Sequence, residues 1–304
     1  MNILLTGGTG FLGSHMLRML LSCGKGNVVL LKRSSSSLDR ISHLMPHKSL
    51  FVYDMDRTPL PEIFREQKVD TILHVATEYG RGNSSCVKAI ETNLVFPVQL
   101  IEEGIKHGLV SFINTDSYFN KDNFSYAHLI DYSLSKKVFL NWLRHFSRQI
   151  KVCNMVLEHI YGEGDSKEKF VPMLIDAVAV NPKERLPLTF GHQKRDFIHV
   201  SDVVSAYKAA LDFTVKNNFR FKEFEVGSGV STSIRSLAEL IKDISKSGTS
   251  LDFGALPYRD DEIMNSFADP IELRNIGWTP LCPLKEGLAR TINFALGRTE
   301  NVEG

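Results

Sequence analysis

The sequence has few cysteines for its length. Four occur among 304 residues, at positions 23, 86, 153 and 282, and no two of them form a Cys-x-x-Cys pair. Cysteines this widely spaced provide neither the ligand spacing of a zinc site nor the dense pairing of a small secreted domain. We therefore expect no metal site, and a reducing, cytoplasmic environment.

The sequence also lacks an excess of either charge and a long apolar run. It has 36 Lys and Arg against 35 Asp and Glu, so no basic surface for nucleic acid is expected. The first residues lead straight into glycines, without the charged start and long apolar segment of a signal peptide, and no stretch is apolar enough to span a membrane. The remaining composition, 43% hydrophobic and 23% charged, is typical of a globular protein.

Short apolar runs alternate with helical segments through the first half of the chain. The runs span residues 2–6, 27–31, 50–53, 71–75, 109–113 and 152–156. Helices are expected at 14–22, 91–106 and 131–149. This alternation is typical of buried parallel strands joined by crossover helices, and it predicts an α/β fold with a Rossmann-type doubly wound sheet.

The alternation breaks after the sixth strand. Helices are expected at 169–180, 233–245 and 283–296, with a loop at 182–187. We expect a nucleotide-binding domain at 1–165 together with about 190–215, and a smaller substrate-binding lobe at 166–189 and 216–304.

A glycine-rich turn lies between the first strand and the first helix. Gly7 allows a tight turn, Gly10 lets the backbone approach a pyrophosphate, and Gly13 lets the helix pack close to the sheet. The helix N-terminus adds unpaired N–H groups that suit an anion. The predicted dinucleotide-binding turn also includes Thr9, Phe11 and Leu12.

The end of the second strand favours NADP over NAD. An acidic residue there accepts from the ribose 2′-hydroxyl of NAD, whereas this chain has Lys32, Arg33 and Ser34, which suit the 2′-phosphate of NADP. Asp54, at the end of the third strand, is positioned to hydrogen-bond the adenine. Further candidate cofactor contacts follow at Val75, Ala76, Thr77 and Asn93.

Tyr132 and Lys136 are four residues apart on an expected helix, so their side chains share a face. A nearby ammonium favours the ionised form of a phenol and lowers its pKa. A tyrosine tuned in this way can exchange a proton with an alcohol or ketone oxygen near neutral pH.

Taken together, the motifs resemble those of the extended short-chain dehydrogenase/reductases, the NAD-dependent epimerase/dehydratase family. They occur in order as Gly7-x-x-Gly10-x-x-Gly13, His74-Val75-Ala76, Thr115, Tyr132-x-x-x-Lys136, Tyr161-Gly162-Glu163-Gly164 and Arg195-Asp196-Phe197-Ile198-His199-Val200-x-Asp202-Val203. Within that family, the segments at 76–80, 114–117, 157–162 and 259–264 look most like 4-ketoreductases of the CDP-abequose synthase type.

The resemblance implies a role for several of these residues. Tyr132 protonates the C4 oxygen of a nucleotide-linked 4-keto-6-deoxy or 3,6-dideoxy sugar as NADPH delivers hydride. Lys136 holds the nicotinamide ribose and keeps the pKa of Tyr132 low, and Thr115 hydrogen-bonds the sugar carbonyl. Arg195 and Arg259 clamp the diphosphate of the substrate. Further contacts implied are His159 for the cofactor, and Glu78, Asp116, Ser117, Lys169 and Phe170 for the substrate.

One departure narrows the reaction. Dehydratases of the family have Thr-Asp-Glu where this chain has Thr115-Asp116-Ser117, and elimination of water needs that carboxylate pair as acid and base. Ketone reduction is therefore the leading interpretation, and the resemblance implies that it serves the synthesis of bacterial surface polysaccharides (O-antigen, lipopolysaccharide). A nucleotide-sugar 4-epimerase and a non-catalytic NADP-sensing protein remain alternatives. The resemblance also implies a homodimer that packs helices 91–106 and 131–149 into a four-helix bundle.

Overall fold

The computed structural model describes residues 1–24, 26–80, 85–121 and 129–298. By compactness the chain divides into two units. The first comprises Met1–Val156 and Tyr207–Phe224, and the second Leu157–Ala206 and Glu225–Gly304. The domain limits expected from the sequence stay a prediction, because they concern which residues bind the cofactor and which bind the substrate.

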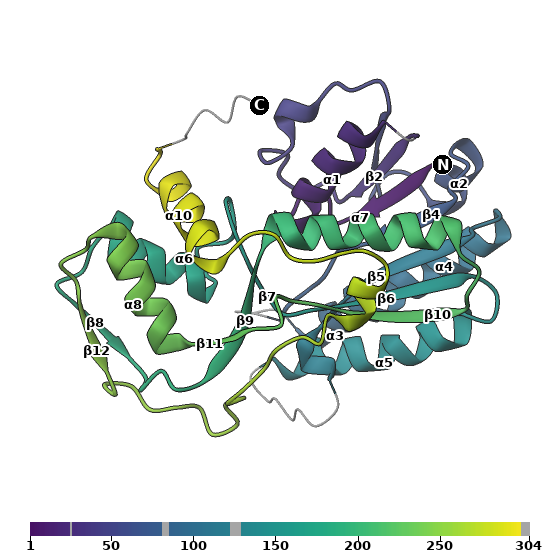
Figure 1. Ribbon diagram of the computed structural model, residues 1–304. Coiled ribbons are helices and arrows are strands. Elements are labelled where there is room, and N and C mark those ends of the chain that lie inside the picture. The colour runs from purple at the N-terminus through teal and green to yellow at the C-terminus, as the bar shows by residue number, and fades with distance from the viewer. Residues whose placement is uncertain (25, 81–84, 122–128, 299–304) are drawn as a thin grey trace. The chain divides into compact units, whose positions relative to one another are not determined.

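A seven-stranded sheet forms the framework of the first unit (Figure 1). Its strands, in chain order, are β1 Ile3–Thr6, β2 Val28–Lys32, β3 Leu50–Asp54, β4 Thr71–His74, β5 Ser111–Ser117, β6 Lys151–Leu157 and β10 Phe221–Val226. Their order across the sheet is β10-β6-β5-β4-β1-β2-β3, and the ladders that join β5, β4, β1, β2 and β3 are parallel. Because the order runs outward from β1 in both directions, the predicted doubly wound Rossmann-type sheet is confirmed.

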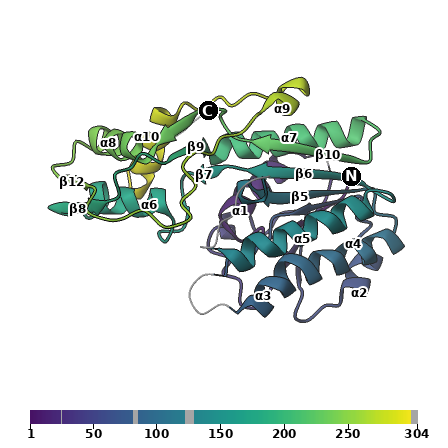
Figure 2. The same ribbon diagram turned by 90° about the horizontal axis from the view of Figure 1, so that it is seen from below.

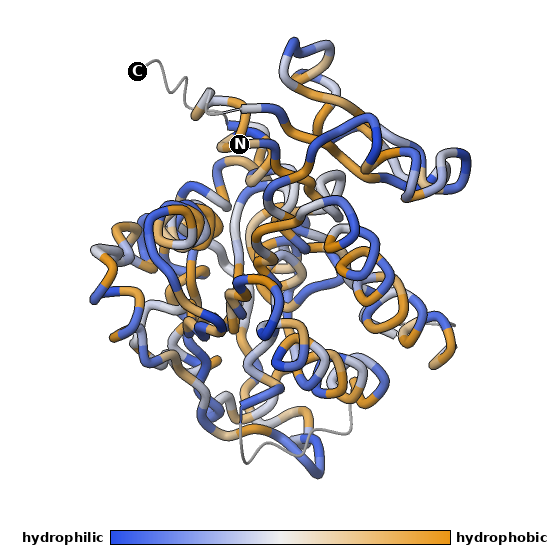
Figure 3. Tube along the Cα trace, turned by 90° about the vertical axis from the view of Figure 1, so that its right-hand side faces the viewer, coloured by the Kyte–Doolittle hydropathy of each residue, from blue (hydrophilic) through white to orange (hydrophobic). Residues whose placement is uncertain are grey.

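Helices cover both faces of this sheet. They are α1 Phe11–Cys23, α2 Leu60–Glu66, α3 Cys86–Ile90, α4 Phe96–Lys106, α5 Ile130–Phe146 and α7 Val200–Lys216, with short turns of helix at Ser42–Leu44 and Tyr118–Asn120. Figure 2 shows α4 and α5 along one face of the strands and α7 along the other. Leu100 and Phe139 pack with Leu4 of β1 in a core without solvent exposure. Polar and apolar residues alternate along the helices in Figure 3, as expected when each helix buries one face.

The helix predicted at 91–106 begins earlier and contains an irregular turn. Helix α3 begins at Cys86 after Ser85, whose side chain accepts from the Lys88 N–H. A π-helical turn, η2 Glu91–Val95, then joins α3 to α4. Pro97 at the start of α4 has no N–H to donate, so the regular hydrogen-bond pattern cannot run through this point and the chain widens by one residue.

Two small sheets and four helices build the second unit. One sheet has the order β11-β9-β7 and the other pairs β12 with β8. The elements are β7 His159–Tyr161, β8 Arg185–Leu188, β9 Lys194–His199, β11 Ser231–Ser233, β12 Ser250–Phe253, α6 Phe170–Ile175 with the π turn Asp176–Val180, α8 Ile234–Ser245, α9 Ile271–Asn275 and α10 Leu284–Ala295. Leu174, Leu237 and Leu288, none of them exposed, form the centre of a core shared by α6, α8 and α10.

The loop predicted at 182–187 is wrong from Arg185 onward, although residues 182–184 lie in no helix or strand. Residues Arg185–Leu188 form β8, which pairs in parallel with β12, and Pro187 lies opposite Asp252. Proline has no N–H to donate, but β8 has a neighbour on one side only, and proline is tolerated on such edge strands. In the described part of the chain, no helix combines the length and apolar character needed to cross a membrane.

Candidate active site

Two glycines of the turn, Gly7 and Gly13, leave no room for a side chain. Gly7 has a φ of 69°, and a Cβ added there would lie 2.6 Å from the Ala76 nitrogen. A Cβ on Gly13 would lie 2.1 Å from the carbonyl oxygen of Gly7. Gly10 is the N-cap of α1, and as a glycine it has no side chain that could cap the helix. The first N–H groups of this helix are therefore available to an anion. The predicted cofactor turn therefore fits a dinucleotide pyrophosphate.

The other residues of this turn differ in exposure. Leu12 is buried at 7% exposed, so any contact it makes with a cofactor is through its backbone. Thr9 and Phe11 are half-buried. The predicted contributions of these three residues stay predictions.

A carboxylate organises the end of β2. Asp54 accepts from Lys32 Nζ at 3.1 Å and from Ser34 Oγ at 2.8 Å. The Ser34 N–H donates to Asp56 at 2.7 Å, and Arg33 is exposed. The three residues predicted to receive a 2′-phosphate thus lie together, with Asp54 holding two of them.

The end of β4 is tied to β1 by Thr6. Its hydroxyl oxygen accepts from the backbone N–H groups of Val75 and Ala76, both at 3.2 Å, and lies 2.9 Å from Nδ1 of His74. His74 has no exposed surface. Burial and then the charge of Lys136 lower its pKa well below the usual value, so His74 is neutral and contributes to the structure of this corner.

Asn93 fixes the segment that follows β4. Its side-chain oxygen accepts from Thr77 Oγ1 at 3.2 Å and from the Glu78 N–H at 2.8 Å. Its amide nitrogen donates to the Glu78 carbonyl at 2.8 Å and to Ser135 Oγ at 3.0 Å. Because Asn93 has no exposed surface, it acts here through the segment it holds. Direct contact with a cofactor stays a prediction.

Thr115, Tyr132 and Lys136 converge at the carboxyl end of β5. The Lys136 ammonium donates to the Thr115 carbonyl oxygen at 2.8 Å. Tyr132 is 6% exposed. Its phenol lies beside Ser117, which lowers its pKa in part, and its ring lies 5.0 Å from that of Tyr79, measured between centroids. The structure thus brings together the three residues predicted to be catalytic, at the sheet edge where such folds bind ligands.

The expected effect of Lys136 on Tyr132 is not seen. Burial, followed by the nearby Tyr79, raises the pKa of Tyr132 well above its usual value. The physical reason is that Tyr132 is almost fully desolvated while the ammonium of Lys136 is directed at the Thr115 carbonyl. Burial lowers the pKa of Lys136 itself to about 8, and Asp116 opposes that shift. The pair is therefore a neutral phenol beside a lysine that titrates just above neutrality.

Asp116 lies inside the protein. It is 2% exposed, and its carboxylate accepts from the Ser117 N–H, from Asn120 Nδ2 and from Asn154 Nδ2. Burial raises its pKa, although Lys136 opposes the shift. The contact with substrate predicted for Asp116 stays a prediction.

The predicted diphosphate clamp lies in the second unit. Arg195, on β9, is 5% exposed; it pairs with Glu262 and donates to the carbonyl oxygens of Lys194 and Ile263. Arg259 is exposed. Both arginines therefore belong to the same unit, and the segment 259–263 contributes to each.

The second unit also contains three further predicted residues, which are His159, Lys169 and Phe170. Lys169 pairs with Asp165 at 2.8 Å, and Phe170 begins α6. Burial, with the charges of Arg195 and Lys169, lowers the pKa of His159 to about 3. His159 is therefore neutral, and its predicted contact with the cofactor stays a prediction.

Two residues at the site were missed by sequence reasoning. The Tyr79 ring packs at a tilt of 34° against that of Tyr132, and its place beside the predicted Glu78 was the available signal. Tyr207, on α7, donates to Thr115 Oγ1 at 2.7 Å, and nothing local in the sequence indicates this contact. Within the described ranges, no group of three His, Cys, Asp or Glu side chains is arranged to hold a metal ion.

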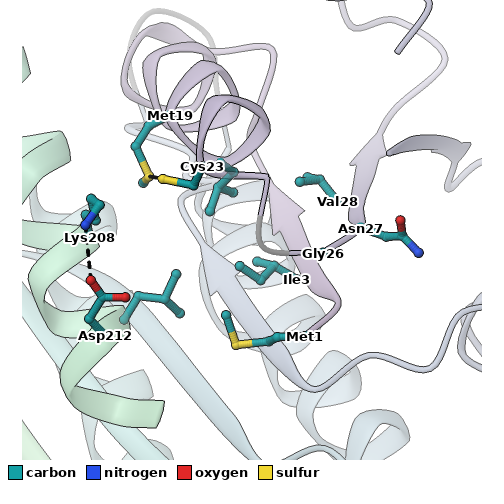
Figure 4. Close-up of a pocket in the computed structure, with 11 residues that line it drawn as sticks. Met1, Ile3, Met19, Cys23, Gly26, Asn27, Val28, Lys208 and Asp212 are labelled. Carbon is teal, nitrogen blue, oxygen red and sulfur yellow. Dashed lines mark hydrogen bonds and ion pairs between the residues drawn. The ribbon is translucent and has the colours of Figure 1, made fainter. Parts of the chain in front are cut away.

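A small pocket of the first unit lies away from these residues. It is found at the amino ends of β1 and β2, among Met1, Cys23, Asn27, Lys208 and Asp212 (Figure 4). Ligands of doubly wound sheets bind at the opposite, carboxyl ends of the strands. The glycine turn and the Thr115, Tyr132 and Lys136 group therefore define the candidate active site.

Comparison with known proteins agrees with this geometry. The chain matches the NAD dependent epimerase/dehydratase family over residues 3–227. It is 32% identical to CDP-abequose synthase of Salmonella typhimurium, over 94% of this chain and 95% of that protein. It is 25% identical to a putative UDP-glucose 4-epimerase of Methanocaldococcus jannaschii, over 96% and 97%.

Solved structures share the fold. UDP-glucose 4-epimerase of Thermotoga maritima, solved with UDP-glucose, superposes with a TM-score of 0.82 at 23% identity, covering 97% of this chain and 98% of its own. MoeE5, solved with UDP-glucuronic acid and NAD, gives a TM-score of 0.81 at 22% identity, covering 98% and 100%. The match over residues 3–227, together with the 32% identity along nearly the whole chain, shows that the chain belongs to the NAD dependent epimerase/dehydratase family.

Proposed function

We propose that this protein is an NADPH-dependent 4-ketoreductase of a nucleotide-linked 4-keto-6-deoxy or 3,6-dideoxy sugar, in the synthesis of bacterial surface polysaccharides. The observation that carries the proposal is the group formed by Thr115, Tyr132 and Lys136, with Ser117 beside Tyr132 where a dehydratase has glutamate. The similarity to CDP-abequose synthase supports the same reaction class.

The state of Tyr132 suits proton donation. Because burial raises its pKa, the phenol holds its proton at neutral pH, and reduction of a ketone needs a proton for the new alkoxide. Thr115 is half-buried and is placed to donate to the sugar carbonyl, which orients that group beside Tyr132. When bound, NADPH supplies the hydride. The glycine turn and Lys136 would hold it.

The end of β2 supports NADPH as the cofactor. Lys32, Arg33 and Ser34 present two cations and a hydroxyl at the point where the adenosine ribose of a Rossmann-bound cofactor lies. Asp54 neutralises part of this charge, yet it also holds Lys32 and Ser34 in place. We expect a lower KM for NADPH than for NADH, measured with the same ketosugar.

The second unit supports a diphosphate-linked substrate. Arg195 is buried, and burying a guanidinium is costly unless an anion accompanies it. Glu262 provides that anion here, and a planar guanidinium binds the oxygens of a diphosphate equally well. Arg259 is proposed as the second arginine of the clamp.

The test is direct turnover. Purified protein is mixed with NADPH and, in turn, the CDP-, dTDP- and GDP-linked 4-keto-6-deoxy sugars, and the absorbance of reduced nicotinamide is followed. The expected result is oxidation of NADPH with at least one of them. Tyr132→Phe is expected to lose activity by about 100-fold or more while NADPH still binds. No oxidation with any of the three sugars would contradict the proposal.

A nucleotide-sugar 4-epimerase is the second candidate. It uses the same three residues, and the solved structures with the same fold include 4-epimerases. An epimerase retains its cofactor through the cycle, so protein purified with stoichiometric NAD(H) and without net oxidation of added NADPH would favour it. A non-catalytic NADP sensor is the third. It predicts that Tyr132→Phe changes nothing measurable.

A homodimer is proposed on the basis of an apolar stripe on α5. Leu134, Val138 and Trp142 follow one another at intervals of four residues and are 56%, 36% and 42% exposed. Val87 and Ile90 of α3, a helix that contacts α5, are 57% and 44% exposed. Exposed apolar side chains grouped in this way are typical of helix–helix interfaces between subunits.

A further inference from the structure

Tyr207 is a buried tyrosine whose hydroxyl reaches the candidate active site. It lies on α7, in the part of that helix that belongs to the first unit, and it is 1% exposed. Its only described hydrogen bond is the one to Thr115 Oγ1, at 2.7 Å. Neither the sequence motifs nor the proposed chemistry gives this residue a role.

The direction of that hydrogen bond determines what Thr115 can do. A threonine hydroxyl has one proton to donate and two lone pairs to accept with. Tyr207 donates to Thr115, so it occupies a lone pair and leaves the Thr115 proton available. Among the described residues, Thr115 Oγ1 has no acceptor for that proton, and the Thr115 side chain is half-buried and accessible.

The backbone of Thr115 is fixed as well. Lys136 donates to its carbonyl oxygen at 2.8 Å, so the peptide and the hydroxyl of the same residue are held from two sides. Burial raises the pKa of Tyr207 above its usual value, and the hydrogen bond to Thr115 offsets only part of this rise. Tyr207 therefore stays protonated, and remains a donor, across the working pH range.

We infer that Tyr207 is a positioning residue, which orients the Thr115 hydroxyl so that its proton points at the carbonyl oxygen of the substrate. This inference rests on the proposed function. Tyr207 has almost no surface with which to touch a ligand, so it acts through Thr115. The hydrogen bond that Tyr207 donates also polarises the Thr115 hydroxyl. This strengthens the hydrogen bond that Thr115 in turn donates to the substrate.

A purely structural role makes a different prediction. If Tyr207 only satisfies its own buried hydroxyl, its removal lowers stability and leaves the rate of the folded enzyme unchanged. If it orients Thr115, its removal lowers kcat, and the loss disappears once the Thr115 hydroxyl is absent. A double-mutant cycle separates the two.

The cycle consists of Tyr207→Phe, Thr115→Val and the double variant, assayed for turnover of the nucleotide sugar. Tyr207→Phe is expected to lower kcat by roughly tenfold, the value of one hydrogen bond, with the KM for NADPH unchanged. The double variant is expected to be no slower than Thr115→Val. The matched control is Tyr161→Phe, which removes an equally buried phenol bonded to the Leu284 carbonyl at 3.3 Å. Its kcat is expected to stay within about twofold.

Three results would overturn the inference. They are an unchanged kcat in Tyr207→Phe, an equal fall in the Tyr161→Phe control, and losses that multiply in the double variant. If Tyr207→Phe does not fold, Tyr207→His takes its place in the same cycle. Absence of turnover by the unaltered chain would overturn the proposed function, and this inference with it, whereas turnover with independent losses overturns this inference alone.

Discussion

The charge of Lys136 is balanced between two opposing influences. Burial at 2% exposure disfavours the ammonium, whereas the Asp116 carboxylate favours it, and the resulting pKa is about 8. Lysine is ordinarily charged up to a pH near 10. The role proposed for this charge, which is to hold the nicotinamide ribose, is therefore sensitive to pH in a range where most lysine sites are not.

We expect the kcat/KM for NADPH to be highest below pH 8 and to fall as the pH rises through 8, because Lys136 then loses its proton. Asp116→Asn removes the group that raises the pKa of Lys136, so the alkaline limb should move to lower pH. Initial rates from pH 6 to pH 10 measure both effects. Asp39→Asn, at a site with an exposed carboxylate, is the control. An alkaline limb that stays in place in Asp116→Asn would show that this carboxylate does not set the lysine pKa.

At the scale of single residues, prediction from sequence succeeded where the signal is local. Tyr132 and Lys136 are four apart on one helix, and Thr115 ends a strand of a recognisable sheet, so their convergence follows from the fold. Tyr207 is 92 residues from Thr115, and an aromatic residue on an amphipathic helix is ordinarily part of the core. The pKa of Tyr132 could not be predicted either, because desolvation depends on packing by Tyr79 and other neighbours.

Among the secondary-structure elements, the turn between β1 and α1 shows how strictly backbone proximity selects glycine. Gly13 and Gly7 contact one another through the backbone, whereas Gly10 has more room. A Cβ on Gly10 would lie 3.2 Å from its nearest neighbour, the Gly7 carbonyl oxygen. Gly13 is therefore required for the close backbone packing of this turn, whereas Gly10 is the glycine proposed to admit the cofactor.

We expect Gly13→Ala to lower the free energy of unfolding by about 1–3 kcal/mol, because its Cβ would overlap the Gly7 carbonyl. Gly10→Ala should cost less stability but weaken NADPH binding. Gly248→Ala, where nothing lies within 4 Å of the added Cβ, is the control and should change neither. Urea unfolding and a fluorescence titration with NADPH give the two quantities. Equal stability of the Gly13→Ala and Gly10→Ala variants would contradict this assignment.

The elements that the sequence predicts well are those with a strong period. The buried parallel strands and α8, whose N-cap Ser233 accepts from the Ser236 N–H at 3.0 Å, were located to within a few residues. Strand β8 was missed because a proline suggests a loop, and its strand character comes from pairing with β12, more than 60 residues later. The π turn before Pro97 was missed as well, because it depends on how α3 and α4 join at a proline that has no N–H to donate.

For the whole molecule, the doubly wound parallel sheet followed from the alternation of elements, because crossover connections in such sheets have a fixed hand. What covers the outer surface of α5 does not follow from the fold of one chain. The stripe of Leu134, Val138 and Trp142 has the character of an interface, and a second copy of the chain is the partner proposed for it.

We expect Leu134→Glu to raise the dissociation constant of the dimer by about tenfold or more, because the new carboxylate would lie in an apolar contact. Light scattering coupled to size-exclusion chromatography measures the mass. Val215→Glu on α7, which also replaces an apolar side chain that is 58% exposed, is the matched control and should leave the mass unchanged. A monomeric unaltered chain, or an unchanged dissociation constant in Leu134→Glu, would show that α5 is not the interface.

The two tryptophans of the chain lie in contrasting surroundings. Trp278 is 4% exposed and donates from its indole nitrogen to Ser205 at 2.8 Å, whereas Trp142 lies on the exposed stripe of α5. Replacing Trp278 with phenylalanine would leave one fluorophore, on the surface where the subunits are proposed to meet. The colour of its emission would then report association directly, moving to longer wavelength as the subunits separate on dilution and water reaches the indole.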